Sequence, residues 1–185
     1  MKKLAVLFAS LLMSFTLHAK EVAGVSIEDQ LTINIQTLTL NGAGVRKMLF
    51  MDLYAGSLYT KHNTSDANTI INSKTPVAMQ LDIVSSMITS ERMAGTVNEG
   101  FETATSGDIA PVRERLDNFI SVFSEDIVKG DRFIMLMIPG EGLKAYKNGT
   151  YLTTVEGDDF GRILLKIWLG EKPADRNLKR SMLNG

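Results

Sequence analysis

Few side chains of this sequence could carry out nucleophilic or redox chemistry, because it contains no cysteine and only two histidines. His18 lies in the apolar N-terminal stretch, which leaves His62, in a polar segment, as the one imidazole beyond it. No G-x-S-x-G motif accompanies His62, so the sequence favours a solvated loop histidine over a Ser-His-Asp triad. The absence of cysteine excludes disulfides, thiolate catalysis and zinc-thiolate sites.

Metal and cofactor motifs are also missing, and we predict neither a metal nor a cofactor. No acidic run has the spacing of a calcium-binding loop, and Gly42-Ala43-Gly44 lacks the third glycine of a dinucleotide-binding turn. Gly140-Glu141-Gly142 would place an acid where a phosphate should lie, so both glycine clusters are interpreted as turns. Asp158-Asp159 could form a catalytic carboxylate pair, but its place at the start of a predicted helix favours capping.

Arg46 is the residue most suited to binding a ligand. It follows a glycine-rich segment within an otherwise apolar stretch, so an inward-pointing guanidinium would need an anionic partner. A ligand carboxylate could bind it through two hydrogen bonds, but so could Glu99 or Glu156, and a surface position is equally compatible. The frequent methionines are either core filler or an adaptable lining for an apolar ligand.

The hydrophobic pattern predicts strands and helices in separate blocks. Alternation from Leu31 predicts a strand with a turn or bulge near Gln36, and 41–44 predicts the next sharp change of direction. Further strands are expected within 45–60, 77–84 and 133–155, the last as two linked hairpins. Helices are expected at 67–72, from Thr89 or Ser90, around 112–123, from Asp158 or Asp159 and near 178–183, so we predict an α+β fold.

The N-terminal residues resemble a cleavable secretory signal. Met1-Lys2-Lys3 is a basic start, Leu4 to Leu17 is apolar, and Leu17-His18-Ala19 resembles a cleavage site. We expect residues 1–19 to be removed, leaving a single domain over 20–185 without a stable membrane anchor, in the periplasm. Removing the two signal lysines would take the net charge from −1 to −3, and no basic stripe is visible, so we expect no nucleic-acid partner.

Several motifs together resemble the chalcone isomerase superfamily, specifically its bacterial exported chalcone-isomerase-like branch. The motifs span nearly all of residues 20–185, and the final one is long enough to be specific. They are Asn41-Gly42-Ala43-Gly44-Val45-Arg46, Leu53-Tyr54-Ala55-Gly56-Ser57-Leu58-Tyr59, Glu99-Gly100-Phe101, Lys129-Gly130-Asp131, Pro139-Gly140-Glu141-Gly142, Val155-Glu156-Gly157-Asp158-Asp159-Phe160 and Ile167-Trp168-Leu169-Gly170-Glu171-Lys172-Pro173.

The resemblance implies an open-faced β-sandwich with helices layered on a large antiparallel sheet. It implies that Arg46 holds a substrate or a fatty-acid carboxylate, and that Tyr54 is the residue found in the fatty-acid binders of the superfamily. Positions that are a catalytic tyrosine and a substrate-contacting asparagine in its enzymes fall at Thr89 and Thr96. These two departures disfavour chalcone cyclisation.

Three functions remain open from the sequence. The first is an exported, non-catalytic protein that binds a small apolar carboxylate such as a fatty acid, with Arg46, Tyr54, Thr89 and Thr96 as its ligand-binding residues. The second is an isomerase or intramolecular lyase acting on an enone-like or phenolic substrate, with Arg46 and Tyr54 catalytic. The third is a structural or partner-binding periplasmic protein without a small-molecule ligand.

Overall fold

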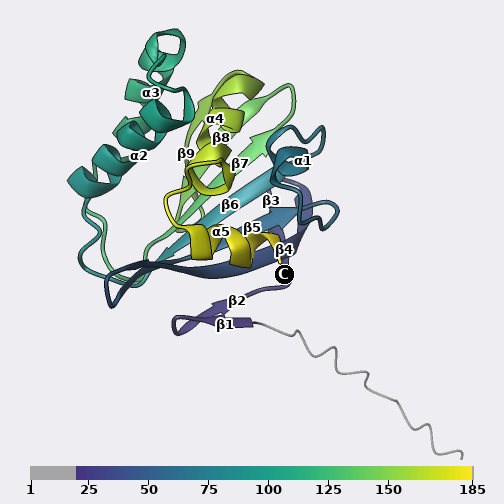
Figure 1. Ribbon diagram of the computed structural model, residues 1–185, viewed down its shortest axis with the longest axis vertical. Helices are drawn as coiled ribbons and strands as arrows, with labels where there is room; N and C mark the ends of the chain where they lie inside the picture. The colour runs from purple at the N-terminus through teal and green to yellow at the C-terminus, as the bar shows by residue number, and fades with distance from the viewer. Residues whose placement is uncertain (1–19, 185) are drawn as a thin grey trace, which may run out of the picture.

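A curled antiparallel sheet organises residues 20–184, which are the residues that the computed structural model describes (Figure 1). Its seven strands follow one another in chain order, so that each pairs with its sequence neighbour. The predicted signal, residues 1–19, lies outside the described residues. The strands are β3 (Gln30–Ile33), β4 (Gln36–Met48), β5 (Met51–Thr60), β6 (Val77–Ile83), β7 (Arg132–Ile138), β8 (Gly142–Lys147) and β9 (Thr150–Val155).

The helices cover one face of this sheet, which confirms the predicted α+β fold with layered helices. α4 packs on β7 and β8, α5 packs on β4 and β5, and α2 packs against α4. Among residues 20–184, no helix has the length and apolar character needed to cross a membrane. The helices are α1 (Ala67–Ile71), α2 (Ser90–Ala104), α3 (Arg113–Ile120), α4 (Asp158–Leu169) and α5 (Arg176–Leu183), with 3₁₀ turns η1 (Ala110–Val112) and η2 (Ser121–Phe123) flanking α3.

The core between the sheet and the helices contains every second side chain of the strands, because successive side chains of a strand point to opposite faces. On β6, which confirms the strand predicted within 77–84, the alternate residues Val77, Met79, Leu81 and Ile83 belong to the helix-side core. Aromatic rings connect the helices above them, since the ring centroids of Phe101 and Phe160 lie 4.8 Å apart and those of Phe119 and Phe160 lie 5.6 Å apart. α2, α3 and α4 are thereby joined into one helical layer.

The opposite face of the sheet is covered in part by a hairpin that the sequence pattern did not predict. Its strands are β1 (Lys20–Val22) and β2 (Val25–Ile27), and Ile27 is fully buried. The Tyr59 hydroxyl on β5 donates to the carbonyl of Glu28 at 3.0 Å and ties this segment to the sheet. A second, smaller apolar cluster therefore lies between this hairpin and the sheet, on the face opposite the helix-side core.

The change of direction predicted at Asn41-Gly42-Ala43-Gly44 is wrong, because these residues lie inside the continuous strand β4. The glycines allow α5 to pack closely against the strand, and they form no turn. A Cβ on Gly42 would lie 2.6 Å from the carbonyl oxygen of Met182, and one on Gly44 would lie 2.6 Å from Cβ of Ser181. The strand thus lacks side chains where α5 lies directly against it.

Asn41 fastens this contact from within a bulge in β4. The register with β5 shifts between Leu40 and Gly42, which leaves Asn41 out of the ladder with its side chain buried. Its amide donates to the carbonyls of Met182 at 2.7 Å and Thr64 at 3.1 Å, and its Oδ1 accepts from the N–H of Thr64 at 2.8 Å. One side chain therefore joins the strand, the loop after β5 and the end of α5.

Candidate functional site

Arg46 and Tyr54, the two residues singled out from the sequence, lie directly opposite each other on neighbouring strands. They are register partners in the β4–β5 ladder, and Tyr54 pairs in turn with Ile83 of β6 on the helix side of the sheet. The guanidinium carbon of Arg46 lies 5.8 Å from the centroid of the Tyr54 ring, which is a cation–π distance. The strand pairing thus places a cation and a phenol side by side.

Trp168 of α4 completes this arrangement from above the sheet. Its indole N–H donates to the Tyr54 hydroxyl oxygen at 2.9 Å, and both side chains are buried. Burial raises the pKa of Tyr54 above 10.0, although the nearby Arg46 charge and the Trp168 hydrogen bond oppose this rise. The phenol is therefore protonated at neutral pH and can act as a hydrogen-bond donor.

A small cavity of about 20 Å³ lies beside these three residues, enough for roughly one water molecule. Its lining is apolar apart from Arg46, Tyr54, Thr96 and the Trp168 ring nitrogen. Thr96, predicted as a ligand-binding residue, faces this cavity, whereas Thr89 does not line it. The cavity is lined by Arg46, Tyr54, Leu81, Ile88, Met93, Thr96, Val97, Ile167 and Trp168.

Thr89 has a structural role at the start of α2. Its side chain accepts a hydrogen bond from the N–H of Arg92 at 3.3 Å, and it is the N-cap of the helix, as the sequence pattern predicted. The residue is exposed to solvent. Of the four predicted site residues, the structure brings Arg46, Tyr54 and Thr96 together around the cavity and leaves Thr89 outside.

Arg46 takes part in none of the ion pairs formed by residues 20–184. Glu99 and Glu156, the protein acids considered as partners, are exposed and make no contact of this kind with it. Asp175 lies near enough to raise the pKa of Tyr54, but its oxygens accept from the backbone N–H groups of Lys47, Asn177 and Leu178. Among the described residues, the half-buried guanidinium therefore contacts Tyr54 and forms no ion pair.

The wall of the cavity opposite the sheet belongs to α2 and the segment before it. This wall consists of Ile88, Met93 and Val97. The helix α2 itself packs mainly against α4 and the α3–η2 region. Figure 1 shows α2 and α3 together on one side of α4. The cavity therefore lies between α2, α4 and the strands β4, β5 and β6.

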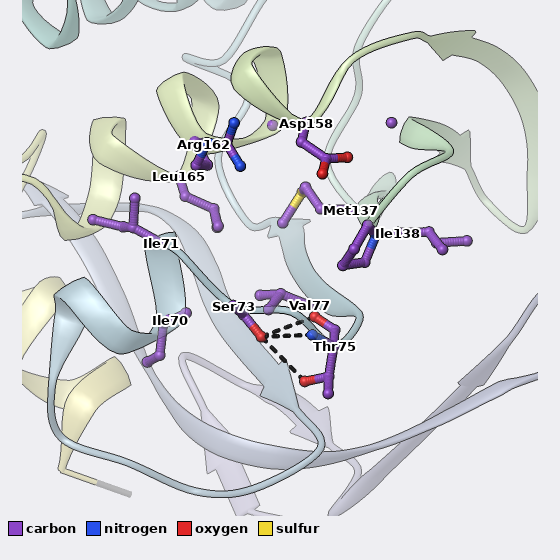
Figure 2. A pocket seen from close by; sticks show the side chains of 13 residues that line it. Ile70, Ile71, Ser73, Thr75, Val77, Met137, Ile138, Asp158, Arg162 and Leu165 are labelled. Atoms are coloured by element: carbon purple, nitrogen blue, oxygen red, sulfur yellow. Dashed lines mark hydrogen bonds between the residues drawn. The ribbon is translucent and has the colours of Figure 1, made fainter.

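Two other hollows lie away from Arg46. Figure 2 shows one of about 30 Å³ between α1, α4 and β7, where Met137, Arg162 and Leu165 approach one another. The other is an open groove of about 990 Å³ with a mostly polar lining, including Lys166 and Lys172. Neither joins a buried polar group to a charged partner as the Arg46 cavity does.

The Asp158-Asp159 pair serves the structure. The N-cap of α4 is Gly157 without a side-chain cap bond, so the predicted capping by either aspartate is wrong. Both lie instead in the first turn of α4, where their negative charges interact favourably with the positive end of the helix dipole. Asp158 accepts from the N–H of Gly140 at 2.8 Å, and Asp159 forms an ion pair with Arg115 at 2.7 Å.

Sequence reasoning did not identify five of the cavity residues, namely Leu81, Ile88, Val97, Ile167 and Trp168. A buried indole N–H needs an acceptor, so Trp168 could have signalled a polar neighbour. Ile88 precedes a predicted helix and carries no motif. Among residues 20–184, no group of three or more potential metal ligands gathers at this cavity or elsewhere.

Comparison with known proteins agrees with the architecture described above. The chain resembles the crystal structure of a fatty-acid binding protein from Arabidopsis thaliana with a TM-score of 0.70 and 20% sequence identity, covering 88% of this chain and 93% of that one. No curated protein matches it in sequence. Residues 19–184 match the family described as chalcone isomerase-like. The chain therefore belongs to the chalcone isomerase-like family.

Proposed function

We propose that this chain is an exported protein of its family's bacterial branch that binds a small apolar carboxylate, such as a fatty acid. The observation that carries the proposal is Arg46, a guanidinium beside an apolar cavity that pairs with no carboxylate among residues 20–184. Leaving a cation partly desolvated costs free energy unless an anion accompanies it. A ligand carboxylate would supply that anion.

Tyr54 is suited to bind the same carboxylate. Its hydroxyl oxygen already accepts from Trp168, so its own proton remains free to donate to a ligand oxygen. The raised pKa keeps that proton in place at neutral pH. Arg46 would therefore bind the carboxylate through its planar fork, and Tyr54 would add a third hydrogen bond.

An acyl chain needs more room than the present cavity of about 20 Å³. The apolar wall formed by Ile88, Met93 and Val97 lies where such a chain would extend from Arg46. Met93 is an unbranched, adaptable side chain, and α2 packs mainly on α4, α3 and η2, so that displacing α2 would leave the strand ladders intact. Ligand entry therefore corresponds to an opening between α2 and the sheet.

The same features disfavour an isomerase or lyase. A tyrosine whose pKa is raised by burial is a poor general base at neutral pH. Thr89, where the resemblance would put the catalytic tyrosine of the enzymes, caps α2 outside the cavity. The similar Arabidopsis protein is named as a fatty-acid binder, which further supports a binding role.

Export to the periplasm is part of this proposal and rests on residues 1–19. Fractionation of the native host and N-terminal sequencing of the isolated protein test it. The expected result is a periplasmic protein that begins at Lys20. A cytoplasmic protein that retains Met1 would contradict the proposed location.

The ligand proposal is tested by titrating dodecanoate and dodecanol into the protein and into an Arg46→Gln variant. Arg113 provides a control arginine, since it does not line the cavity and its side-chain partners are Asp117 and Asn98. We expect dodecanoate to bind the wild type and Arg113→Gln equally, and at least tenfold more weakly to Arg46→Gln. Dodecanol should bind the wild type weakly and be insensitive to Arg46.

Two results would overturn the assignment. One is the absence of dodecanoate binding to wild-type protein that was stripped of lipid under refolding conditions. The other is equal affinity of wild type and Arg46→Gln for dodecanoate, with both variants folded by circular dichroism.

A further inference from the structure

The turn between β4 and β5 carries four consecutive large apolar side chains that the fold leaves in solvent. Met48, Leu49, Phe50 and Met51 retain 41%, 83%, 99% and 42% of their accessible surface. The hairpin end lies at the lower left of Figure 1, at the edge of the molecule. We call these four residues the hairpin tip. Single exposed apolar residues are ordinary, but a contiguous exposed group indicates an interaction surface.

The turn itself does not require these side chains. Leu49 has a φ of 56°, a left-handed conformation in which glycine is preferred, and the loop between the paired residues Met48 and Met51 has only two residues. A Gly-Ser sequence would close the same hairpin without the strain of Leu49 or the exposure of Phe50. The tip therefore costs free energy in the isolated protein, which indicates that its apolar side chains contact a binding partner.

The charges next to the tip are paired with each other. Lys47 and Asp52 follow it on the two strands, are register partners, and form an ion pair at 3.1 Å. The charges next to the tip therefore neutralise each other, and the next register pair along the two strands is Arg46 and Tyr54 of the cavity. An apolar cap above a self-neutralised charge pair suits entry into an apolar phase, because no unpaired charge of the hairpin must leave water.

We propose that the hairpin tip docks the protein on a lipid bilayer by inserting Leu49 and Phe50 below the headgroups. The tip consists of four side chains, whereas a standard protein interface involves roughly 20–30 residues on each side. A bilayer requires no complementary shape, and its binding strength scales with the apolar area inserted. A lipid surface therefore matches this feature better than a second copy of the chain does.

The docked orientation would place the cavity close to the membrane. Tyr54 lies four residues from Phe50 along β5, which is roughly 13 Å of extended strand. Apolar segments of interfacial proteins insert roughly 5–10 Å, so Arg46 and Tyr54 would stay at headgroup level. The inference goes beyond the ligand proposal and does not depend on it, since docking needs only the tip.

The test is flotation of the purified exported protein with phosphatidylcholine vesicles in the absence of added ligand. The variant Leu49→Gly/Phe50→Ser removes the apolar tip and relieves the left-handed leucine. Ile35→Gly is the matched control, because Ile35 is 95% exposed at φ 60° in the turn at the other end of β4. We expect at least a tenfold lower partition coefficient for the tip variant, and wild-type binding for Ile35→Gly.

Binding of the wild type should change little between low and high salt, since apolar insertion and not net charge drives it. Absence of wild-type binding, or equal binding by the tip variant, would overturn the proposal. If the tip variant instead lost only a concentration-dependent dimer in sedimentation, the partner would be a second copy, and lipid docking would be wrong. Dodecanoate binding measured on the tip variant separates failure of this proposal from failure of the ligand site.

Discussion

At the scale of single residues, the hydrogen bond between Trp168 and Tyr54 holds the polar end of the cavity in place. It joins α4 to β5 between two side chains 114 positions apart in the sequence, and both are buried. A buried donor that loses its acceptor costs more free energy than the bond itself contributes, because water cannot replace the partner. The Tyr54 hydroxyl is therefore structural before any ligand binds.

Removing this hydroxyl tests its contribution to stability. Tyr54→Phe leaves the indole N–H of Trp168 buried without its acceptor, and we expect the free energy of unfolding to fall by about 1–3 kcal/mol. Urea denaturation followed by fluorescence measures the loss directly at the site, because Trp168 is the only tryptophan of the chain. Its emission in the folded variant should also shift.

Tyr151 provides the comparison for this substitution. It is 54% exposed, and its hydroxyl shares a hydrogen bond with Thr154 at the surface. Tyr151→Phe should change the free energy of unfolding by no more than about 0.5 kcal/mol. Equal losses in the two variants would show that the buried hydrogen bond contributes nothing special.

At the scale of elements, the contact between α5 and the β4–β5 pair depends on glycines that have no turn to form. Gly42, Gly44 and Gly56 all face residues of α5 at distances that a Cβ would not allow. All three stay within the β4–β5 ladder, in which Gly42 pairs with Leu58 and Gly44 pairs with Gly56. The absence of side chains at the three glycines thus lets α5 pack directly against the backbone of β4 and β5.

Gly42→Ala should disrupt this packing. The added methyl would lie 2.6 Å from the Met182 carbonyl oxygen, which is backbone and cannot rotate away, so we expect a loss of about 1–3 kcal/mol. Equilibrium unfolding in urea gives the value. Gly95 on the exposed side of α2 has open space around it, and Gly95→Ala should raise stability by about 0.4–1 kcal/mol. A neutral Gly42→Ala variant would contradict the close approach.

Much of the element pattern could be predicted from the sequence, because it rests on local periodicity. β6, α2 and α4 formed as their apolar spacing indicated, and the β4–β5 ladder brought together Arg46 and Tyr54. The role of the glycines in β4 could not be predicted, since it depends on a helix about 140 residues later. The same limit hid Trp168, whose acceptor lies on a strand far away in the chain.

At the scale of the whole molecule, carboxylates with lowered pKa link distant segments and make stability depend on pH. Burial alone would raise the pKa of Asp131, but hydrogen bonds from Val128 and Asn148 and the charge of Lys147 outweigh it and hold it below 3.8. The pKa of Asp159 is likewise lowered, by its hydrogen bonds from Arg115. Both groups favour the folded state while ionised.

The direction of the effect follows from proton linkage. A carboxyl whose pKa is lower in the folded state stabilises the protein above its unfolded pKa, and this stabilisation is lost as the pH falls through the folded value. We expect Asp131→Asn to lower the melting temperature by several degrees at pH 7. The gap to wild type should narrow as the pH falls below about 4 and the carboxyl becomes protonated in the folded state as well. Calorimetry across this range would contradict the account if the gap stayed constant.

The structure of residues 20–184 brings together a family fold, a cavity lined by an arginine without an ion-pair partner among these residues, and an apolar hairpin tip on the same pair of strands. The central claim is that Arg46 holds the carboxylate of an apolar ligand. It predicts that the bound ligand stays ionised at pH values where the free acid is protonated, because the guanidinium lowers the carboxyl pKa.

The most direct measurement is the ¹³C NMR spectrum of dodecanoate labelled at its carboxyl carbon, recorded with the protein while the pH is lowered. The account predicts a bound resonance whose shift does not titrate through the pKa of the free acid, and its loss or normal titration in Arg46→Gln. A bound resonance that titrates like the free acid in wild-type protein, or that is identical in Arg46→Gln, would contradict the claim.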